Sequence, residues 1–583
     1  MFRENTNHLQ GNMFGVTNRV SKSLQQKINN SAESTFYRLI FSRIDERLFK
    51  GLYSEEASRP NAAINAMVSA LILMKLRNWT YEELFENMQF HMLVRIALGL
   101  QDLETMPFCM ATLFNFQNRL NDHFIRTGEN LFEQVFDGLT SRQLKELQVK
   151  AHICRTDSVM VASNIRSYSR LQLLIEMLLR IYRTLDKADQ ERYGEYFARY
   201  LGKSSGQYIY TLKSEELASE LQLVGELYHW IDRQLKPAYG DRQVFQVFER
   251  VYQEHFTVVS DLFACTAEAD RVVLRPSSEL HSGCVQSPDD LDAAYREKNG
   301  RPIRGHVISV VETATPENEV NLITDVVIEA ANTDDSAILN ERLDRIKEKT
   351  PEINELHFDG GYGSETNDKK MQKEEITPVQ TAIRGRKSSC EISIEQNESG
   401  GFEVSCPLQQ VQARATRKRF KACFDKNICR SCEHNNNTPE GTSGCRLISQ
   451  KKWQVYYFRE ADYLKQCRQR SLQKIPAERR SIRNNVEATI KEFSCRMPGR
   501  KVRVRGKFKT SLFAYGVAIG VNFGRIYRHL QKKKEQELTT DLNITLGIIM
   551  SGRFGRKFKN ISRYLNQLLV FHRKYNISVK GAF

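Results

Sequence analysis

Two aspartates that lie far apart in the sequence have the surroundings expected of metal-binding carboxylates. Asp359 ends a short strand-like segment and is followed directly by Gly360 and Gly361. Glycine frees the backbone just beyond the carboxylate, which suits a metal-binding mouth at the end of a strand. Asp157 lies inside an alternating, strand-like segment, where a carboxylate is costly unless it is solvated, paired or bound to a metal. Asp359 alone also fits a plain turn, so its meaning depends on its partners.

A third carboxylate, Glu487, lies in a segment whose periodicity predicts a helix from Pro476 to Phe493. The expected buried stripe consists of Ile482, Val486, Ile490 and Phe493. A second stripe at helical spacing consists of Arg480, Arg483, Glu487 and Lys491. This second stripe is typical of a solvated face with i,i+4 ion pairs, and it also fits a metal-binding glutamate flanked by phosphate-binding cations. Glu492, on a different face, is the alternative carboxylate.

The charge balance favours a polyanionic partner, either nucleic acid or an anionic membrane surface. The chain carries 86 Lys and Arg against 70 Asp and Glu, a net charge of +16. Its densest basic segment, residues 496–509, contains seven Lys or Arg among fourteen residues and no acidic residue. This density fits contacts with a phosphate backbone and salt-dependent binding. The candidate DNA contacts in this segment are Arg500, Lys501, Arg503, Arg505 and Lys507.

Hydropathy indicates a cytoplasmic protein. No apolar run reaches the ~18 residues of a membrane span, and the N-terminal residues lack the apolar core of a signal peptide. In a reducing compartment the twelve cysteines are expected to be thiols or metal ligands.

Six of these cysteines lie between Cys390 and Cys445, in a segment that we expect to be loop-rich and without a core of its own. Cys429 and Cys432 form a CxxC pair, and with Cys406 and Cys445 they could form a closed four-thiolate zinc site. Cys390 or Cys423 could replace one of these ligands. Free surface thiols are the simpler alternative, and no thioredoxin-like pattern supports a redox CxxC.

Hydrophobic periodicity predicts an all-helical N-terminal block, with Thr80 and Glu83 as a capping box and Thr112 as a further helix cap. A strand at 151–161 follows, then a long helical stretch at 167–261. Paired strands at 306–312 and 322–330 come next, and Asp335 is expected to cap the following helix. The Asp359 strand, a short polar helix and a strand at 379–383 complete the series. This is the element order of the ribonuclease-H-like fold, with a helical insertion after the first strand.

The expected fold class is therefore mixed α/β (α+β), with three regions. Residues 1–147 form a helical domain that serves either DNA binding or as a scaffold. Residues 148–530 form a ribonuclease-H-like domain that contains a helical insertion at 165–275 and a Cys-rich module at 386–450. Residues 531–583 form a basic tail, which contributes to DNA binding or closes as a helical hairpin.

Several short motifs follow one another over nearly the whole chain: Ser58–Asn61, Tyr81–Leu84, Ile96–Leu100, Ala111–Leu120, Thr156–Ser158, Ser287–Asp290, Ala294–Lys298, Asp359–Tyr362, Cys406–Pro407, Cys429–Cys432, Arg483, Glu487, Arg503–Gly506 and Asn522–Arg525. With these motifs the chain resembles the DDE transposases of bacterial insertion sequences, most closely the 1182 group within the broader InsH-like set. It departs from the family pattern at Arg480, where a tyrosine is common, and at Ser494, where a lysine is expected; Lys491 could substitute.

The resemblance implies that Asp157, Asp359 and Glu487 form a catalytic triad, although 202 and 128 residues separate them in sequence. Three carboxylates could hold two Mg²⁺ (or Mn²⁺) ions about 3.5–4 Å apart, which activate the nucleophile and stabilise the leaving oxygen. The resemblance also implies Arg525 as a DNA contact. The expected partners are the element's terminal inverted repeats and target DNA, bound by a homodimer or higher oligomer in the bacterial nucleoid.

The expected activity is thus metal-dependent DNA cleavage and strand transfer. A decayed or domesticated DNA-binding protein and a structure-selective nuclease of the same fold are the alternatives.

Overall fold

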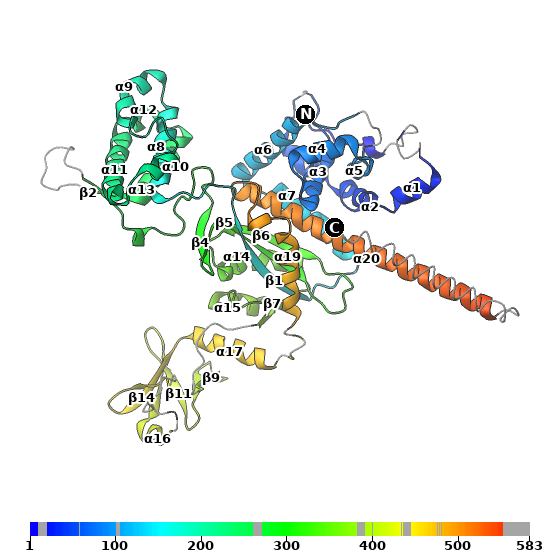
Figure 1. The fold of residues 1–583 in the computed structure, drawn as a ribbon. Coiled ribbons are helices and arrows are strands. Elements are labelled where there is room, and N and C mark those ends of the chain that lie inside the picture. The colour runs from blue at the N-terminus through cyan, green and yellow to red at the C-terminus, as the bar shows by residue number, and fades with distance from the viewer. Residues whose placement is uncertain are drawn as a thin grey trace. The chain divides into compact units, whose positions relative to one another are not determined.

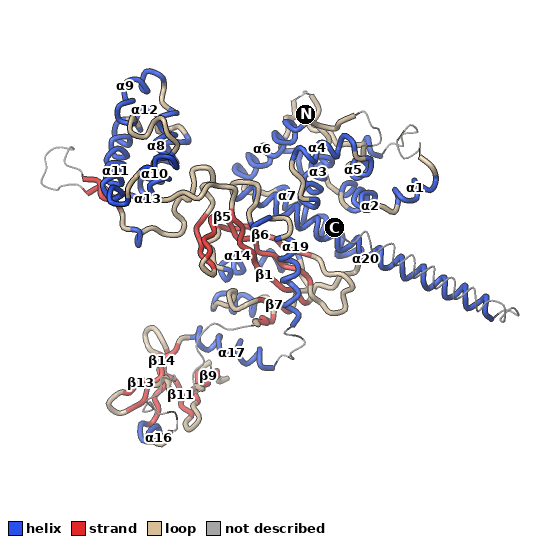
Figure 2. Tube along the Cα trace, in the orientation of Figure 1, coloured by secondary structure: helices blue, strands red, loops and turns tan. Residues whose placement is uncertain are grey.

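The computed structural model describes residues 1–9, 15, 20–56, 59–100, 105–259, 271–381, 391–398, 400–432, 434, 445–474, 476, 479 and 481–551, without the side chains of 471, 472, 538 and 541–551. The chain divides into two compact units, Met1–Asn522 and Phe523–Phe583. The described part of the second unit is a stretch of one long helix. Most of the expected basic tail lies outside the described residues. Helices and strands are both abundant (Figures 1 and 2), so the expected mixed class is confirmed.

The N-terminal region is helical, as expected, and its centre is α3 (Ile64–Arg77), which is buried over most of its length. Thr80 and Glu83 form the predicted capping box at the start of α4. The cap predicted at Thr112 is wrong, because its helix begins earlier, at Met110, with Cys109 in the cap position. The helices of this region are α1 (Lys22–Asn29), α2 (Ala32–Leu39), α3, α4 (Tyr81–Phe90), α5 (Met92–Ala97), α6 (Met110–Thr127) and α7 (Leu131–Glu146).

A six-stranded sheet occupies the centre of the first unit. Asp157 lies within one of its strands, and Asp359 directly follows another. Its strands are β1 (Ile153–Ala162), β4 (Ala294–Lys298), β5 (Arg301–Thr313), β6 (Ile323–Ala330), β7 (Glu355–Phe358) and β8 (Thr377–Gln380). Strands run in the order β6–β5–β1–β7–β8, and β4 pairs with the start of β5. β5 is antiparallel to β1 and β6, whereas β7 is parallel to β1 and β8.

Two helices follow strands of this sheet in the expected places: α14 (Asp335–Lys349) after β6 and α15 (Glu365–Lys373) after β7. Leu339, Leu343 and Ile346 of α14 are buried, as their spacing predicted. The cap assigned to Asp335 is wrong, since Asp334 occupies the cap position and Asp335 is the first residue of the helix. The side chain of Asp335 is therefore available for another contact.

The segment between β1 and β4 is a helical insertion with its own hydrophobic core. Its helices are α8 (Arg170–Thr184), α9 (Lys187–Phe197), α10 (Ser205–Thr211), α11 (Leu217–Gln234), α12 (Lys236–Tyr239) and α13 (Gln243–His255). The helical stretch ends at His255, earlier than predicted. The β-branched residues after it instead form β2 (Phe256–Val259), which pairs with β3 (Arg271–Leu274).

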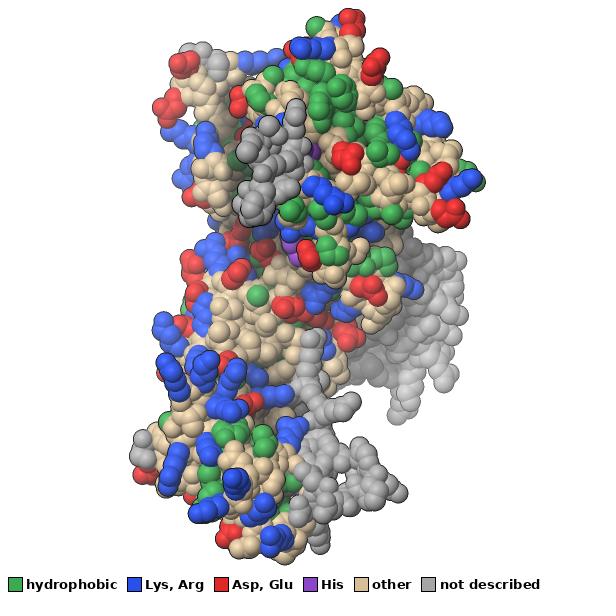
Figure 3. Space-filling view, turned by 90° about the vertical axis from the view of Figure 1, so that its left-hand side faces the viewer, with side chains coloured by type: hydrophobic (Ala, Val, Ile, Leu, Met, Phe, Trp, Pro, Cys, Tyr) green, Lys and Arg blue, Asp and Glu red, His purple; other side chains and the backbone are tan. Residues whose placement is uncertain are grey.

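The Cys-rich segment is a second six-stranded sheet, so the expectation of a loop-rich segment without a core is wrong. Phe402, Val404, Phe424 and Phe458 are among its buried residues. Its strands are too short to show a clear alternation of apolar and polar residues in the sequence. They are β9 (Ser393–Gln396), β10 (Phe402–Ser405), β11 (Gln410–Ala415), β12 (Phe420–Asp425), β13 (Ile448–Ser449) and β14 (Trp453–Phe458). In Figure 3, Lys and Arg side chains gather over this sheet, at the bottom of the view.

The helix predicted from Pro476 to Phe493 is not continuous. The described residues form a 3₁₀ turn, η8 (Ser481–Asn485), followed by α19 (Val486–Ser494). Val486 and Phe493 are buried, as the predicted stripe requires, whereas Ile482 and Ile490 are partly exposed.

A 45-residue helix, α20 (Lys507–Ser551), begins after the basic segment. Within the first unit, the Asn522 side chain bonds both the backbone N–H (2.8 Å) and the carbonyl (2.9 Å) of Ile323 at the start of β6. This contact explains an asparagine in the Asn522–Arg525 motif, because the edge strand would otherwise leave both groups unpaired. Among the described residues, no helix is long and apolar enough to span a membrane.

Candidate active site

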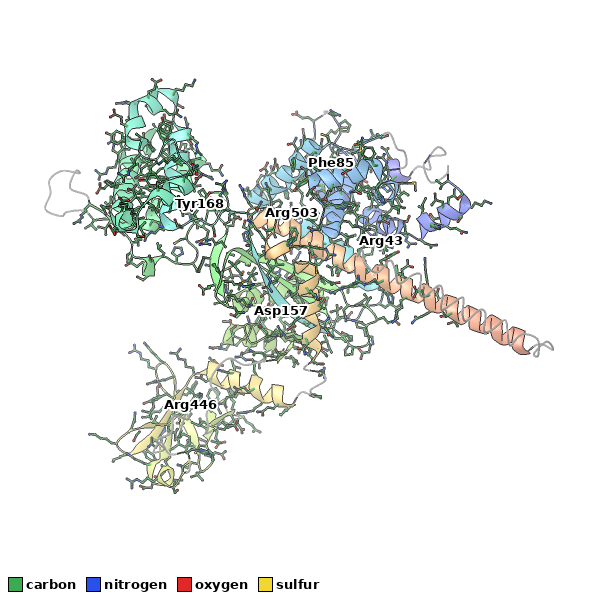
Figure 4. All side chains as sticks on the ribbon, in the orientation of Figure 1. Arg43, Phe85, Asp157, Tyr168, Arg446 and Arg503 are labelled. Atoms are coloured by element: carbon green, nitrogen blue, oxygen red, sulfur yellow. The ribbon has the colours of Figure 1, made fainter. Side chains whose placement is uncertain are left out.

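Asp157 and Asp359 lie at the same level on neighbouring parallel strands. β1 and β7 pair Arg155 with His357, so two further residues along each strand place Asp157 level with Asp359. The guanidinium of Arg483 joins them: its Nη2 lies 3.2 Å from Oδ2 of Asp157 and 4.0 Å from Oδ2 of Asp359. The structure therefore brings together three of the predicted site residues. In Figure 4, Asp157 lies on the central sheet beside α19.

The site holds negative charge in a partly buried place. Burial raises the pKa of Asp157, and Asp359 and Asp335 raise it further, against the lowering effects of the Ser158 N–H and Arg483. The Asp157 side chain is 16% exposed, whereas that of Asp359 is 38% exposed. Asp157 is thus the more buried of the two carboxylates, and Asp359 is the more accessible to solvent. A cation is needed beside them, and Arg483 supplies one here.

Two close contacts shape the segment that follows Asp359. The Gly361 N–H donates to Oδ1 of Asp359 (2.7 Å), which fixes the carboxylate. A Cβ on Gly363 would lie 2.8 Å from Oε1 of Gln380 on the neighbouring strand β8. The motif is therefore a turn, as its local sequence suggests, and it also presents a carboxylate next to Asp157.

Asp335 is a neighbour of the site that the sequence interpretation missed. The Ser158 hydroxyl donates to Oδ1 of Asp335 (2.7 Å), which links β1 to the first turn of α14. Tyr362 is fully buried, and burial, Asp335 and Asp157 raise its pKa. The sequence predicts only a local capping role for Asp335. Hydrophobic periodicity carries no information about a contact with a residue as remote in sequence as Ser158.

α19 is fastened beside β1 by a buried ion pair. The Arg155 Nε lies 2.6 Å from Oε1 of Glu312, whose side chain is completely buried. The Thr489 hydroxyl of α19 donates to Oε2 of Glu312 (2.6 Å), and Nη1 of Arg155 donates to the Ile482 carbonyl (2.8 Å). A buried carboxylate without these partners would be strongly destabilising, so the pair fixes both η8 and α19.

This docking leaves Glu487 exposed on α19, four residues after Arg483. Lys491 is exposed on the same helix, and Glu492 is partly buried. Arg480 lies outside the described residues. The structure thus gathers Asp157, Asp359 and Arg483 and places Glu487 on the adjacent helix.

The basic segment after α19 lies along the end of β1. The Val502 N–H bonds the Ala162 carbonyl (3.0 Å), and the Asn164 N–H bonds the Val504 carbonyl (3.1 Å). Val502 is buried in this segment, and Nη1 of Arg505 lies 3.4 Å from Oδ1 of Asp289. Arg500, Lys501, Arg503 and Arg505 are exposed, while Lys507 is partly buried and pairs with Glu329. Arg525, on α20, is partly buried.

Asp290 joins the Ser287–Asp290 and Arg503–Gly506 motifs. Its Oδ2 accepts hydrogen bonds from the Gly506 N–H (2.8 Å) and from the Ser163 hydroxyl, and it lies 3.6 Å from Nε2 of buried His306. These contacts lower the pKa of Asp290 in spite of its burial. The acidic motif is thus an anchor for the basic segment.

Residues 23–119 match a transposase domain. The matching family model is DUF772, and the match runs from α1 into α6. No match was found among curated proteins or solved structures. The N-terminal domain therefore supports a transposase family for this chain.

Cys406, Cys432 and Cys445 lie near enough to Cys429 to affect its thiol, but in the described part of the chain no three of these Sγ atoms lie within 4.8 Å of one another. Cys406, Cys429 and Cys445 pack against the core of the second sheet. Burial raises the pKa of the Cys429 thiol, and the neighbouring Cys406, Cys445 and Cys432 add to this effect. Cys423 alternates with buried Ala422 and Phe424, which places it on the opposite face of β12. Cys390 lies outside the described residues.

The same module has a basic surface that the sequence interpretation did not single out. In the β11–β12 turn, Arg417, Lys418 and Arg419 are exposed, and the Arg419 guanidinium lies 3.7 Å from the centre of the Tyr457 ring. Trp453 is 47% exposed on β14. Cations next to exposed aromatic rings are suited to nucleic-acid contacts.

Proposed function

We propose that this protein is a transposase that cleaves DNA at the ends of an insertion sequence and joins those ends to target DNA. One observation carries the proposal: Asp157 and Asp359 lie level on adjacent parallel strands, bridged by Arg483, in a chain whose N-terminal domain matches transposases. The strand order β6–β5–β1–β7–β8 supports a ribonuclease-H-like assignment for the central domain. The assignment to the 1182 group rests on the motifs alone.

Asp157 and Asp359 offer the oxygen ligands that a divalent metal takes, although in the described part of the chain Glu487 does not form a three-ligand group with them. Asp157 and Asp359 already share one cation, and burial makes an unneutralised Asp157 costly. Glu487 is proposed as the third ligand, from the helix fastened by Glu312 and Thr489. Bound Mg²⁺ or Mn²⁺, two ions per site, would activate the attacking oxygen and stabilise the leaving one.

The other residues bind and orient DNA in this proposal. Arg483 would bind a DNA phosphate, because a guanidinium binds phosphate and carboxylate with similar geometry. Lys491 lies on α19, four residues beyond Glu487. Arg480 is assigned from the predicted helical stripe, and Arg525 is assigned only by the family pattern. Arg500, Lys501, Arg503, Arg505 and Lys507 track the phosphate backbone. A structural zinc ion would be held by Cys406, Cys429, Cys432 and Cys445. The two DNA ends would be paired by a dimer or larger oligomer in the bacterial cytoplasm.

The test uses the full-length protein with DNA that carries the two ends flanking its gene and a target plasmid, with and without Mg²⁺. We expect nicked ends and joined products only when Mg²⁺ is present. Specific binding without cleavage would instead indicate a DNA-binding protein. Cleavage without joining would indicate a nuclease.

A further inference from the structure

Three side chains with metal-binding atoms meet where the helical insertion returns to the central sheet. Glu254 lies at the end of α13, and His281 and Cys284 lie in the loop before β4. A carboxylate oxygen of Glu254, a ring nitrogen of His281 and Sγ of Cys284 all lie within 4.8 Å of one another. Zinc bonds of about 2.0–2.3 Å keep the ligand atoms of a tetrahedral site within about 4 Å of each other, so small side-chain rotations would close this group around an ion.

Local contacts hold the three ligands in place. Oε1 of Glu254 lies 2.9 Å from Nε of Arg250, and its Oε2 accepts from the Val285 N–H (2.7 Å). The Cys284 N–H bonds the His281 carbonyl (3.1 Å), which forms a His-x-x-Cys turn. Each Glu254 oxygen keeps a further lone pair for a metal.

A neighbouring cavity supplies an independent sign of a ligand. His281 and Cys284 line a cavity of about 310 Å³ together with His255 and Arg170. His255 is 4% exposed, and its Nδ1 accepts from Nε of Arg170 (3.1 Å). The ring proton must then lie on Nε2, which has no hydrogen-bond partner within the described part of the chain. A buried N–H donor on the cavity wall calls for an oxygen atom that it can bind, such as a metal-bound water molecule.

We propose that Glu254, His281 and Cys284 bind a Zn²⁺ ion whose fourth ligand is a water molecule hydrogen-bonded to His255 Nε2. The mixed carboxylate, imidazole and thiolate set suits zinc. The ion fastens the last helix of the insertion to the loop that continues into Ser287–Asp290, and Asp290 anchors the basic segment through Gly506. This site is distinct from the four-cysteine group of the second sheet.

The experiment measures zinc per chain by mass spectrometry in the full-length protein purified with Zn²⁺ and then desalted. His281→Ala removes an exposed ligand without opening the core, and Cys284→Ala removes the second ligand. Each variant should contain about one zinc equivalent less than the unchanged protein. The matched control is His152→Ala, which removes another partly exposed histidine near a carboxylate and should leave the zinc content unchanged.

The comparison is independent of any zinc held by the four cysteines, because that zinc is common to all these proteins. Circular dichroism on the same samples identifies a variant that has lost its fold. If Cys284→Ala has done so, the zinc content of His281→Ala alone tests the proposal. Equal zinc content in His281→Ala and His152→Ala would overturn the proposal, as would an unchanged protein that retains no more zinc than His281→Ala. This outcome does not depend on whether the protein cleaves DNA.

Discussion

At the scale of single residues, Arg483 decides the electrostatics of the site. Its side chain is 14% exposed and reaches both aspartates, at 3.2 and 4.0 Å. A unit positive charge in this position balances the two carboxylates, and it also opposes the entry of a divalent ion. In the proposed mechanism, Arg483 therefore has two effects that can be separated: competition with metal in the free protein and a phosphate contact in the DNA complex.

We expect Arg483→Gln to bind Mn²⁺ more tightly in the absence of DNA. The gain should be about fivefold or more, because a unit charge 4 Å away contributes ~1 kcal/mol even in water. The same variant should cleave DNA about 10²-fold more slowly, the usual cost of losing one contact to the developing charge. Calorimetric titration with Mn²⁺ and single-turnover cleavage measure the two effects.

Arg479→Gln is the matched control, since Arg479 pairs with Glu355 and not with the aspartates. Its Mn²⁺ affinity should equal that of the unchanged protein. Weaker Mn²⁺ binding by Arg483→Gln would show that the guanidinium supports the metal site and does not compete with it.

At the scale of elements, α19 owes its position to side chains that are remote in sequence. Glu312 on β5 accepts from Arg155 on β1 and from Thr489 on α19. All three groups are buried. The helix that carries Glu487, the proposed third ligand, is therefore held by a hydrogen bond from Thr489, two residues further along.

Thr489→Val should shift α19 and reduce cleavage more than DNA binding. Valine matches the shape of threonine but leaves Oε2 of Glu312 without this donor, at a cost of about 1–3 kcal/mol. Thr510→Val is a matched control, because the Thr510 hydroxyl is buried and lacks a partner among the described residues. Denaturant unfolding and cleavage rates measure both; equal effects of the two substitutions would argue against the docking role of Thr489.

The same contacts explain which elements the sequence could predict. β1 was predicted from an alternating segment that contains Asp157, and β7 from a short strand-like segment that ends before Asp359; both are found where expected. The segment before α19 was misassigned as helix, because its 3₁₀ turn is fixed by Arg155 and not by local propensity. The contact between Ser158 and Asp335 was likewise beyond periodicity, since it joins residues 177 apart in sequence.

At the scale of the whole first unit, a charge network joins α7 to the central sheet. Asp325 on β6 is 2% exposed and bonds Arg342 and Lys349 of α14. Arg342 also lies 2.9 Å from Glu133, and Lys349 lies 2.7 Å from Asp137, both on α7. Burial acts to raise the pKa of Asp325, but Arg342 and Lys349 outweigh it, so the pKa lies below its usual value of 3.8.

Asp325→Asn should lower the free energy of unfolding by about 3 kcal/mol at neutral pH, the low end for a broken buried pair. A carboxyl with a lowered folded pKa stabilises the protein above its unfolded pKa and loses this effect as the pH falls through the folded value. The difference between the two proteins should therefore shrink below about pH 3.8. Asp344→Asn, which breaks the pair between the largely exposed Asp344 of α14 and Lys370 of α15, should cost at most ~1 kcal/mol. A pH-independent difference for Asp325→Asn would contradict the charge argument.

The central claim is that Asp157, Asp359 and Glu487 act together on DNA. The most direct measurement is Mg²⁺-dependent cleavage of the element ends by Asp157→Asn, Asp359→Asn and Glu487→Gln, beside Glu492→Gln as the control on the same helix. We predict that the first three variants lose cleavage by about 10³-fold or more, that all four still bind the ends in a gel-shift assay, and that Glu492→Gln keeps its activity. Near-normal cleavage by Asp157→Asn and Asp359→Asn would contradict the account, and loss of cleavage in Glu492→Gln but not in Glu487→Gln would move the third ligand to Glu492.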